Sequence, residues 1–272
     1  MKNTPPSPTL PPQGVKGEGV DVSRRFGGII RTYGEAAFDR FTAAHVCVIG
    51  VGGVGSWAVE ALARSGIGTL TLIDLDNVAE SNINRQLPAL GSTIGRAKIA
   101  VLQERCLDIN SACQLHLVED FIDKDNLANL IKPEFDYVLD CIDNARTKAA
   151  LIAYCRRNKI RLITAGGAGG QKDPTKIRLT DLTKTLQDPL LSKVRKELRQ
   201  HYGFSSNPKR RFDVPAVWSE EAMTLPERTE GASACDLSCA GGIGSVTTVT
   251  ASFAFIAVSH VLGKLAATSL AT

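Results

Sequence analysis

A glycine-rich segment near residue 50 has the residue types and spacing to bind the phosphates of a nucleotide. Gly50, Gly52 and Gly55 form the pattern G-x-G-x-x-G between an apolar run and a region of helical spacing, and Gly53 lies within it. Glycine lets a backbone approach phosphate closely, and the helix that follows directs N–H groups at the anion. Many proteins that bind NAD, FAD or other nucleotides share this pattern, and a tight turn without a ligand is the alternative.

Residues that follow the glycine segment favour a triphosphate. Backbone amides alone would neutralise a triphosphate poorly, whereas Arg85 can add a bidentate cation, Lys98 a point charge and Asn82 an uncharged donor. Asp143 is expected at the C-terminal end of a buried strand, where a carboxylate could hold Mg²⁺ that bridges the phosphates. We therefore predict an ATP site with Arg85, Lys98 and Asp143 as catalytic residues. Each of them taken separately would be interpreted as a surface charge or a helix cap.

A carboxylate after the second expected strand completes the nucleotide site. Asp74 ends that strand, at a position where a carboxylate can accept hydrogen bonds from ribose hydroxyls. A dehydrogenase has no evident use for Asn82, Arg85 and Gln86, so hydride transfer is the weaker interpretation. The predicted ATP-binding residues are Gly50, Gly52, Gly53, Gly55, Asp74, Asp76, Asn82, Arg85, Gln86 and Lys98.

Strands alternate with helices through the first two-thirds of the chain. This rhythm predicts an α/β fold with a doubly wound, mainly parallel, Rossmann-like sheet, because continuous apolar runs are typical of strands covered on both faces. The expected strands are 46–50, 69–74, 114–119, 136–143 and 160–167, and the expected helices are 56–64, 97–110 and 144–158.

The rhythm breaks after residue 170. We expect a strand over 176–182, a basic helix over 189–201, an irregular segment over 203–233 with Pro208, Pro215 and Pro226 as breakers, and a long C-terminal helix. Residues 1–22 are rich in Pro and Gly and are predicted to form a disordered tail. The prediction is therefore a single domain over 23–272, in which 170–240 is an inserted segment on the substrate side.

The composition of the chain bears on its partners and its cellular location. The net charge of +4 permits a polyanionic partner without demanding one. Seven scattered cysteines indicate buried thiols in a reducing compartment, so we expect a cytoplasmic protein. Residues 240–263 lack Lys, Arg, Asp and Glu, which leaves membrane association as an alternative, but their glycines, threonines and serines favour a buried helix.

The motifs GVGGVGS, LIDLDNV, SNINRQ, GRAK and DCID together resemble the ubiquitin-activating-enzyme superfamily, which includes bacterial adenylating enzymes of thiamine and molybdopterin synthesis. The resemblance implies adenylation of a carboxylate with Mg-ATP on a homodimeric, Rossmann-like fold. It also implies that Asp74 binds ribose, that Asn82, Arg85 and Lys98 bind the phosphates, and that Asp143 binds magnesium.

Segments 25–41, 150–160, 164–177, 188–199 and 250–262 are similar to the tRNA threonylcarbamoyladenosine dehydratase branch of that superfamily. This branch implies ATP-dependent cyclisation of threonylcarbamoyladenosine beside the anticodon of tRNA, through an adenylated carboxylate and release of AMP and pyrophosphate. The alternatives are adenylation of the C-terminus of a small sulfur-carrier protein and an interaction partner in sulfur trafficking.

The chain departs from its relatives in three ways. It contains no C-x-x-C pair, so we expect no zinc, and Cys235 and Cys239 are interpreted as packing residues. Residues 212–223 contain no cysteine, which argues against thioester chemistry. The superfamily resemblance implies an N-terminal arginine that reaches across the dimer, and Arg24, Arg25 and Arg31 all stay open for that role.

Basic residues late in the chain are candidates for binding tRNA. Cations at such density can contact phosphates, although a solvated face with compensating acids is an equal alternative. The candidates are Lys193, Arg195, Lys196, Arg199, Lys209, Arg210 and Arg211.

Overall fold

A seven-stranded sheet organises the computed structural model, which describes residues 21–224 and 243–267. The strand order is β3-β2-β1-β4-β5-β7-β6, with parallel pairing throughout except for the antiparallel pair β6 and β7. The strands are β1 (His45–Ile49), β2 (Thr69–Ile73), β3 (Gln114–Val118), β4 (Tyr137–Asp140), β5 (Leu162–Ala165), β6 (Ile177–Asp181) and β7 (Pro215–Ser219). The predicted doubly wound, mainly parallel sheet is confirmed.

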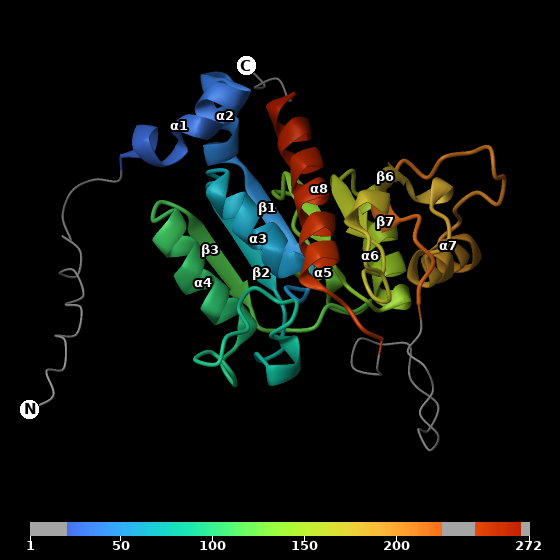
Figure 1. Ribbon diagram of the computed structural model, residues 1–272. Helices are drawn as coiled ribbons and strands as arrows, with labels where there is room; N and C mark the ends of the chain where they lie inside the picture. The colour runs from blue at the N-terminus through green and yellow to red at the C-terminus, as the bar shows by residue number, and fades with distance from the viewer. Residues whose placement is uncertain (1–20, 225–242, 268–272) are drawn as a thin grey trace, which may run out of the picture.

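Helices cover both faces of this sheet (Figure 1). They are α1 (Val22–Tyr33), α2 (Glu35–Ala43), α3 (Gly55–Arg64), α4 (Lys98–Ile109), α5 (Leu127–Leu130), α6 (Ala145–Arg157), α7 (Pro189–His201) and α8 (Thr247–Ala266). Short 3₁₀ turns occur at η1 (Glu80–Asn82), η2 (Pro174–Lys176) and η3 (Leu182–Lys184). The first twenty residues of the predicted tail lie outside the described residues, whereas Val22 already belongs to α1.

Alternation along the central strands builds two hydrophobic cores. Val46 and Val48 of β1 face the core beneath α3, α4 and α8, whereas Cys47 and Ile49 face the core beneath α5, α6 and α7. Successive side chains of a strand point to opposite faces, so a strand that is buried on both faces must be apolar at every position. This is why the continuous apolar runs in the sequence mark the central strands.

Strand β7 corrects one prediction. Residues 203–233 were expected to be irregular because of their prolines, but residues 215–219 form a buried strand between β5 and β6. Pro215 is tolerated because it occupies the first position of the strand, where its missing N–H costs least. Cys235 and Cys239, and the proposed breaker Pro226, lie outside the described residues.

The expected long C-terminal helix is α8. It packs against α2 and α3 through buried residues such as Val249, Phe253 and Ala257. Within the described ranges it is the one helix long and apolar enough to cross a membrane, and 56% of its apolar window is buried inside the protein. This burial is the packing expected of a core helix.

Candidate active site

The glycine segment forms a tight turn from the end of β1 into α3. Gly50 has φ +80°, and a Cβ atom on Gly55 would lie 1.9 Å from the carbonyl oxygen of Gly50, so neither position accepts another residue without strain. The Val51 N–H donates to Asp74 Oδ2 at 2.7 Å. Within the described part of the chain, the N–H groups of Gly52 and Gly53 donate no hydrogen bond, and they are available to an anion.

Arg85 and Gln86 lie against this turn. A Cβ atom built on Gly53 would be 3.7 Å from Arg85 Cδ, and one built on Gly52 would be 3.7 Å from Gln86 Nε2. Gln86 Oε1 is buried and has no hydrogen-bond partner in the described structure. Buried acceptors normally have a partner, so this oxygen indicates a donor that a bound ligand or water would supply.

The backbone of Arg85 is held from two helices. Trp57 of α3 donates its Nε1–H to the Arg85 carbonyl at 3.1 Å, and Thr247 of α8 donates its hydroxyl to the Asn84 carbonyl at 2.5 Å. Asn84 Nδ2 in turn donates to the Ser245 carbonyl at 2.7 Å. These contacts position the Arg85 guanidinium beside the turn, a structural role that the sequence did not reveal for Asn84.

A chain of contacts joins the turn to Lys98. Asp74 accepts from the N–H of Val51 and, at 2.8 Å, from the N–H of Asp76, whose Oδ2 lies 2.8 Å from Lys98 Nζ. Burial raises the pKa of the Asp74 carboxyl. The Lys98 side chain is only 6% exposed, so its charge needs the Asp76 partner while no phosphate is bound. Lys98 therefore lies inside the site and not on its rim.

Asn82 has a role within its own turn. Its side-chain oxygen accepts from the N–H of Ala79 at 3.1 Å, which stabilises η1. This hydrogen bond uses only the side-chain oxygen, so the Asn82 Nδ2 amide group remains a predicted phosphate donor.

The position of Asp143 differs from the prediction. Strand β4 ends at Asp140, and Asp143 is an exposed residue of the loop that follows. The loop lies beside the glycine turn, because a Cβ atom on Gly50 would be 3.0 Å from the Cys141 carbonyl oxygen. No hydrogen bond or ion pair joins Asp143 to Arg85 or Lys98, whose partners among the described residues are Ser81, Asn84 and Asp76. Asp140, the last residue of the strand, forms a buried ion pair with Lys148 that the sequence analysis missed.

A magnesium site that depends on Asp143 fits the donors present. The described residues hold no cluster of three or more His, Cys, Asp or Glu side chains that could bind a metal. Mg²⁺, however, usually binds through one or two carboxylates together with substrate phosphates and waters. A single exposed carboxylate next to the glycine turn is therefore compatible with magnesium carried in by a nucleotide.

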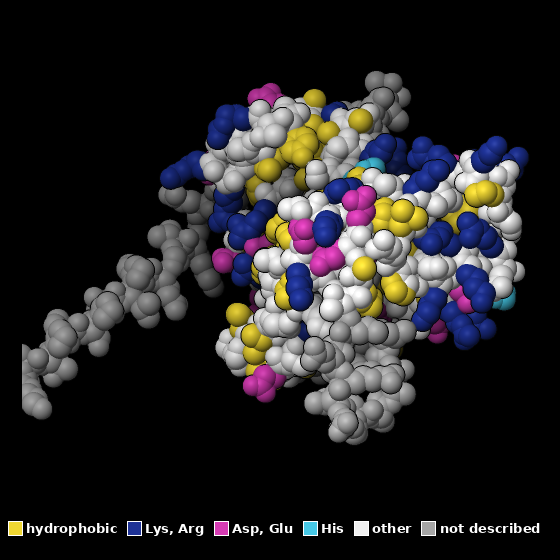
Figure 2. Space-filling model, turned by 45° about the vertical axis from the view of Figure 1, so that its right-hand side comes forward, with side chains coloured by type: hydrophobic (Ala, Val, Ile, Leu, Met, Phe, Trp, Pro, Cys, Tyr) yellow, Lys and Arg dark blue, Asp and Glu magenta, His cyan; other side chains and the backbone are white. Residues whose placement is uncertain are grey.

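The basic residues of the C-terminal half gather on one side of the protein. Figure 2 shows Lys and Arg side chains clustered on the right-hand side, to which α7 belongs. Lys193, Lys196, Lys209 and Arg210 are exposed. Two other candidates are occupied by protein groups. Arg195 bonds the Thr185 hydroxyl, and the Arg199 guanidinium lies 5.4 Å from the centre of the Phe212 ring.

Residues 26–271 match the ThiF family. The chain therefore belongs to the ThiF family, in agreement with its Rossmann-like sheet and glycine turn.

Individual relatives define the branch to which the chain is similar. It is 55% identical over 246 residues to tRNA threonylcarbamoyladenosine dehydratase of Haemophilus influenzae, covering 90% of this chain and 94% of the relative. It is 51% identical over 254 residues to the enzyme of the same name from Escherichia coli, covering 90% and 94%.

Solved structures agree with these relatives. The crystal structure of the Escherichia coli dehydratase in complex with ATP superposes with a TM-score of 0.83 at 50% identity, covering 91% of this chain and 96% of the other. The complex of that enzyme with AMP gives the same TM-score and identity. These neighbours agree with the predicted fold and with the family resemblance that the sequence motifs indicated.

Proposed function

We propose that this protein uses ATP to dehydrate threonylcarbamoyladenosine in tRNA, closing a ring on the modified nucleoside next to the anticodon. The observation that carries the proposal is the glycine turn with unpaired N–H groups, flanked by Arg85, Gln86 and the Asp74–Asp76–Lys98 chain. It is supported by the ATP and AMP complexes of a relative that is 50% identical over most of its length.

The first step activates the threonine carboxylate. A carboxylate oxygen attacks the α-phosphorus of ATP, an O–P bond forms, and the bond to pyrophosphate breaks. Negative charge develops on the phosphoryl oxygens and on the leaving group. Arg85, the turn N–H groups and Lys98 are placed to offset it, and preorganised groups of this kind usually provide the largest catalytic contribution. Lys98 would exchange Asp76 for a phosphate oxygen.

Magnesium fits this step through Asp143. A bound Mg²⁺ would supply charge neutralisation to the triphosphate. The exposed Asp143 carboxylate is the group of this chain that would hold it, and the Asp140–Lys148 pair fixes the start of the loop that carries Asp143.

The second step needs no nucleophile from the protein. A nitrogen of the carbamoyl group attacks the acyl carbon of the mixed anhydride, a C–N bond forms, and AMP leaves with the carboxylate oxygen. The nitrogen loses a proton, and the nucleoside is lighter by one water. Proximity within one molecule supplies much of the rate. The proposal therefore places no cysteine in the mechanism.

Several partners belong to the same proposal. The exposed cations of α7 and of residues 209–211 contact tRNA phosphates, the protein acts as a homodimer in the cytoplasm, and a sulfur-trafficking protein is a further partner. Figure 2 supports the tRNA contact alone, through its cluster of Lys and Arg side chains. The homodimer and the sulfur-trafficking partner rest on the family resemblance, and the cytoplasmic location rests on the scattered cysteines.

The deciding experiment is a mass measurement. Purified protein is incubated with Mg-ATP and tRNA that carries threonylcarbamoyladenosine, and the modified nucleoside is then weighed. Loss of one water that depends on ATP, with AMP and pyrophosphate formed, supports the proposal. An unchanged nucleoside, with AMP transferred instead to a small protein that ends in Gly-Gly, would favour the sulfur-carrier alternative.

A further inference from the structure

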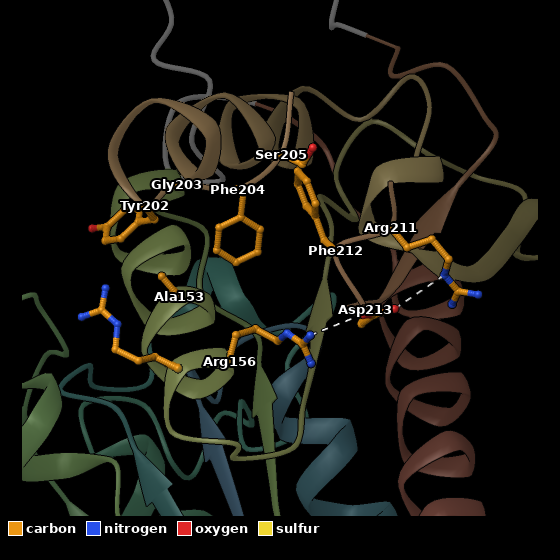
Figure 3. A pocket seen from close by; sticks show the side chains of 10 residues that line it. Ala153, Arg156, Tyr202, Gly203, Phe204, Ser205, Arg211, Phe212 and Asp213 are labelled. Carbon is orange, nitrogen blue, oxygen red and sulfur yellow. Dashed lines mark hydrogen bonds and ion pairs between the residues drawn. The ribbon is translucent and has the colours of Figure 1, made fainter. Parts of the chain in front are cut away.

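A second hollow lies far from the glycine turn, where α6 and α7 end. Its volume is about 370 Å³, and it is open to solvent on one side (Figure 3). Volumes of this size can hold a small organic group such as a nucleotide. The lining residues are Ala153, Arg156, Arg157, Tyr202, Gly203, Phe204, Ser205, Arg211, Phe212 and Asp213.

Aromatic rings form one wall of the hollow. Tyr202 and Phe204 are half-buried and line the hollow (Figure 3), so part of each ring is open to a ligand. Phe212 is buried behind them, 4.9 Å from Phe204 in an edge-to-face contact. This support fixes the orientation of Phe204. Flat aromatic surfaces of this kind stack with nucleobases of any sequence.

Three of the residues that line the hollow are arginines. Arg156 lies 3.4 Å from Asp213, and Arg211 lies between two acids, 3.7 Å from the buried Asp181 and 3.9 Å from Asp213. Arg157 is exposed and makes no ion pair or hydrogen bond among the described residues. Arg156 and Arg211 are therefore paired with aspartates, and among the described residues Arg157 keeps an uncompensated positive charge at the hollow.

We propose that this hollow binds one nucleotide of the tRNA other than the nucleotide that reacts. The base stacks on Tyr202 and Phe204, and its phosphate binds Arg157 together with Arg156 or Arg211. This inference rests on the proposed function and adds a docking point to it. Helix α6 has 13 residues and starts next to Asp143, so the two sites lie about 20 Å apart. A macromolecular substrate can span that distance.

The combination of groups favours RNA over a free metabolite. The hollow is shallow and open, which leaves much of a small ligand in water and gives it few contacts. A polynucleotide gains affinity from many phosphates at once, and the exposed Lys193 and Lys196 lie on α7, which packs against α6 and ends at the hollow. The hollow is thereby one of several tRNA contacts, together with the exposed lysines of α7.

The test compares two charge reversals. Arg157→Glu changes an exposed, unpaired residue of the hollow, and Lys124→Glu makes the same change in charge at an exposed residue after β3, at the far edge of the sheet. Binding of tRNA carrying threonylcarbamoyladenosine is measured by fluorescence anisotropy at several salt concentrations. We expect Arg157→Glu to weaken binding about tenfold or more and to reduce the salt slope by about 1, while Lys124→Glu stays near wild type.

A second variant tests stacking. Phe204→Leu retains an apolar contact with Phe212 and removes the flat ring, so we expect tRNA affinity to fall about fivefold or more without a change in the salt slope. Binding of Mg-ATP should stay unchanged in both hollow variants.

The outcomes separate this proposal from the proposed function. If wild type fails to dehydrate the tRNA, the proposed function fails first. If wild type dehydrates it and both hollow variants bind tRNA like wild type, the hollow is not a docking point. Weakened binding of free AMP with unchanged binding of tRNA would assign the hollow to a small molecule and overturn the RNA proposal.

Discussion

Lys148 Nζ lies 2.9 Å from Asp140 Oδ2, and both side chains are fully buried. The same Nζ also donates to the Thr164 hydroxyl at 3.0 Å, and the Thr164 hydroxyl donates to Asp140 Oδ2 at 2.7 Å. The other oxygen of Asp140 accepts the N–H of Ile142 at 3.1 Å. The end of β4, the start of the Asp143 loop, α6 and β5 are thereby joined by one polar cluster.

Removing one partner of this pair should destabilise the protein strongly. Lys148→Met leaves the Asp140 carboxylate buried without its cation, and breaking buried pairs in this way typically costs about 3–5 kcal/mol. Urea unfolding at pH 7 measures the loss. The double variant Asp140→Asn/Lys148→Met should recover part of it, because no buried charge is left. Equal stabilities for the single and double variants would contradict this account.

Arg85→Ala should lower kcat by about 10²–10³, as the loss of one preorganised charge-stabilising group does in other enzymes. The Arg85 side chain is partly exposed, and its guanidinium donates to the Ser81 carbonyl and to Asn84 Oδ1, so the fold should be retained. Arg64→Ala is the matched control, because Arg64 lies at the end of α3 and Glu60 keeps Arg105 as a partner. Steady-state dehydration rates with saturating Mg-ATP give the comparison. A rate for Arg85→Ala equal to that of the control would remove Arg85 from the mechanism.

Gly55→Ala should abolish nucleotide binding. The added Cβ would lie 1.9 Å from the Gly50 carbonyl oxygen, so the turn must open, at a cost of about 1–3 kcal/mol in stability. Gly91→Ala is the control, because nothing lies within 4 Å of a Cβ at that glycine. Isothermal titration with Mg-ATP and urea unfolding measure both effects. Wild-type affinity in Gly55→Ala would show that the turn does not approach the phosphates.

Stability should fall below neutral pH because of His260. Burial, and then Lys264, lowers the pKa of His260 from its ordinary value of 6.5. The unfolded chain therefore takes up the proton first as the pH falls through 6.5, and stability decreases toward the lower pKa of the folded state. His260→Phe keeps a ring against Tyr137 and removes the titration. Urea midpoints at pH 7.5 and 5.5 should differ less in this variant than in wild type, and an equal difference would exclude His260 as the cause.

The sequence predicted the parts of the fold that repeat a simple pattern. The apolar run of β1 and the helical spacing after Gly55 follow directly from burial on two faces and on one stripe. Strand β7 could not be found in the same way, because Pro215 is normally a breaker and its position at the very start of a strand depends on the neighbouring strands.

The sequence motifs named the residues of the candidate site, whose roles stay predictions, but did not reveal the contacts among them. Motif spacing placed Arg85 and Lys98 near the glycine turn, and the structure brings both beside it through Gly53 and Asp76. The Asp140–Lys148 pair was missed because a buried lysine has no signature of its own in the sequence. The one available hint is the position of Lys148 on the apolar face of the helix over residues 145–157.

Helix α6 starts at Ala145, is capped by the Asn144 side chain beside the Asp143 loop, and ends at Arg157 in the hollow. A hydrogen-bonded helix keeps its length, so the distance between the two sites at its ends is fixed. A molecule that must contact both sites has to span this distance, so its size decides whether it can bind. On the two proposals made above, a lone nucleoside with the reactive group would be a poor substrate, because it reaches only one of the two sites.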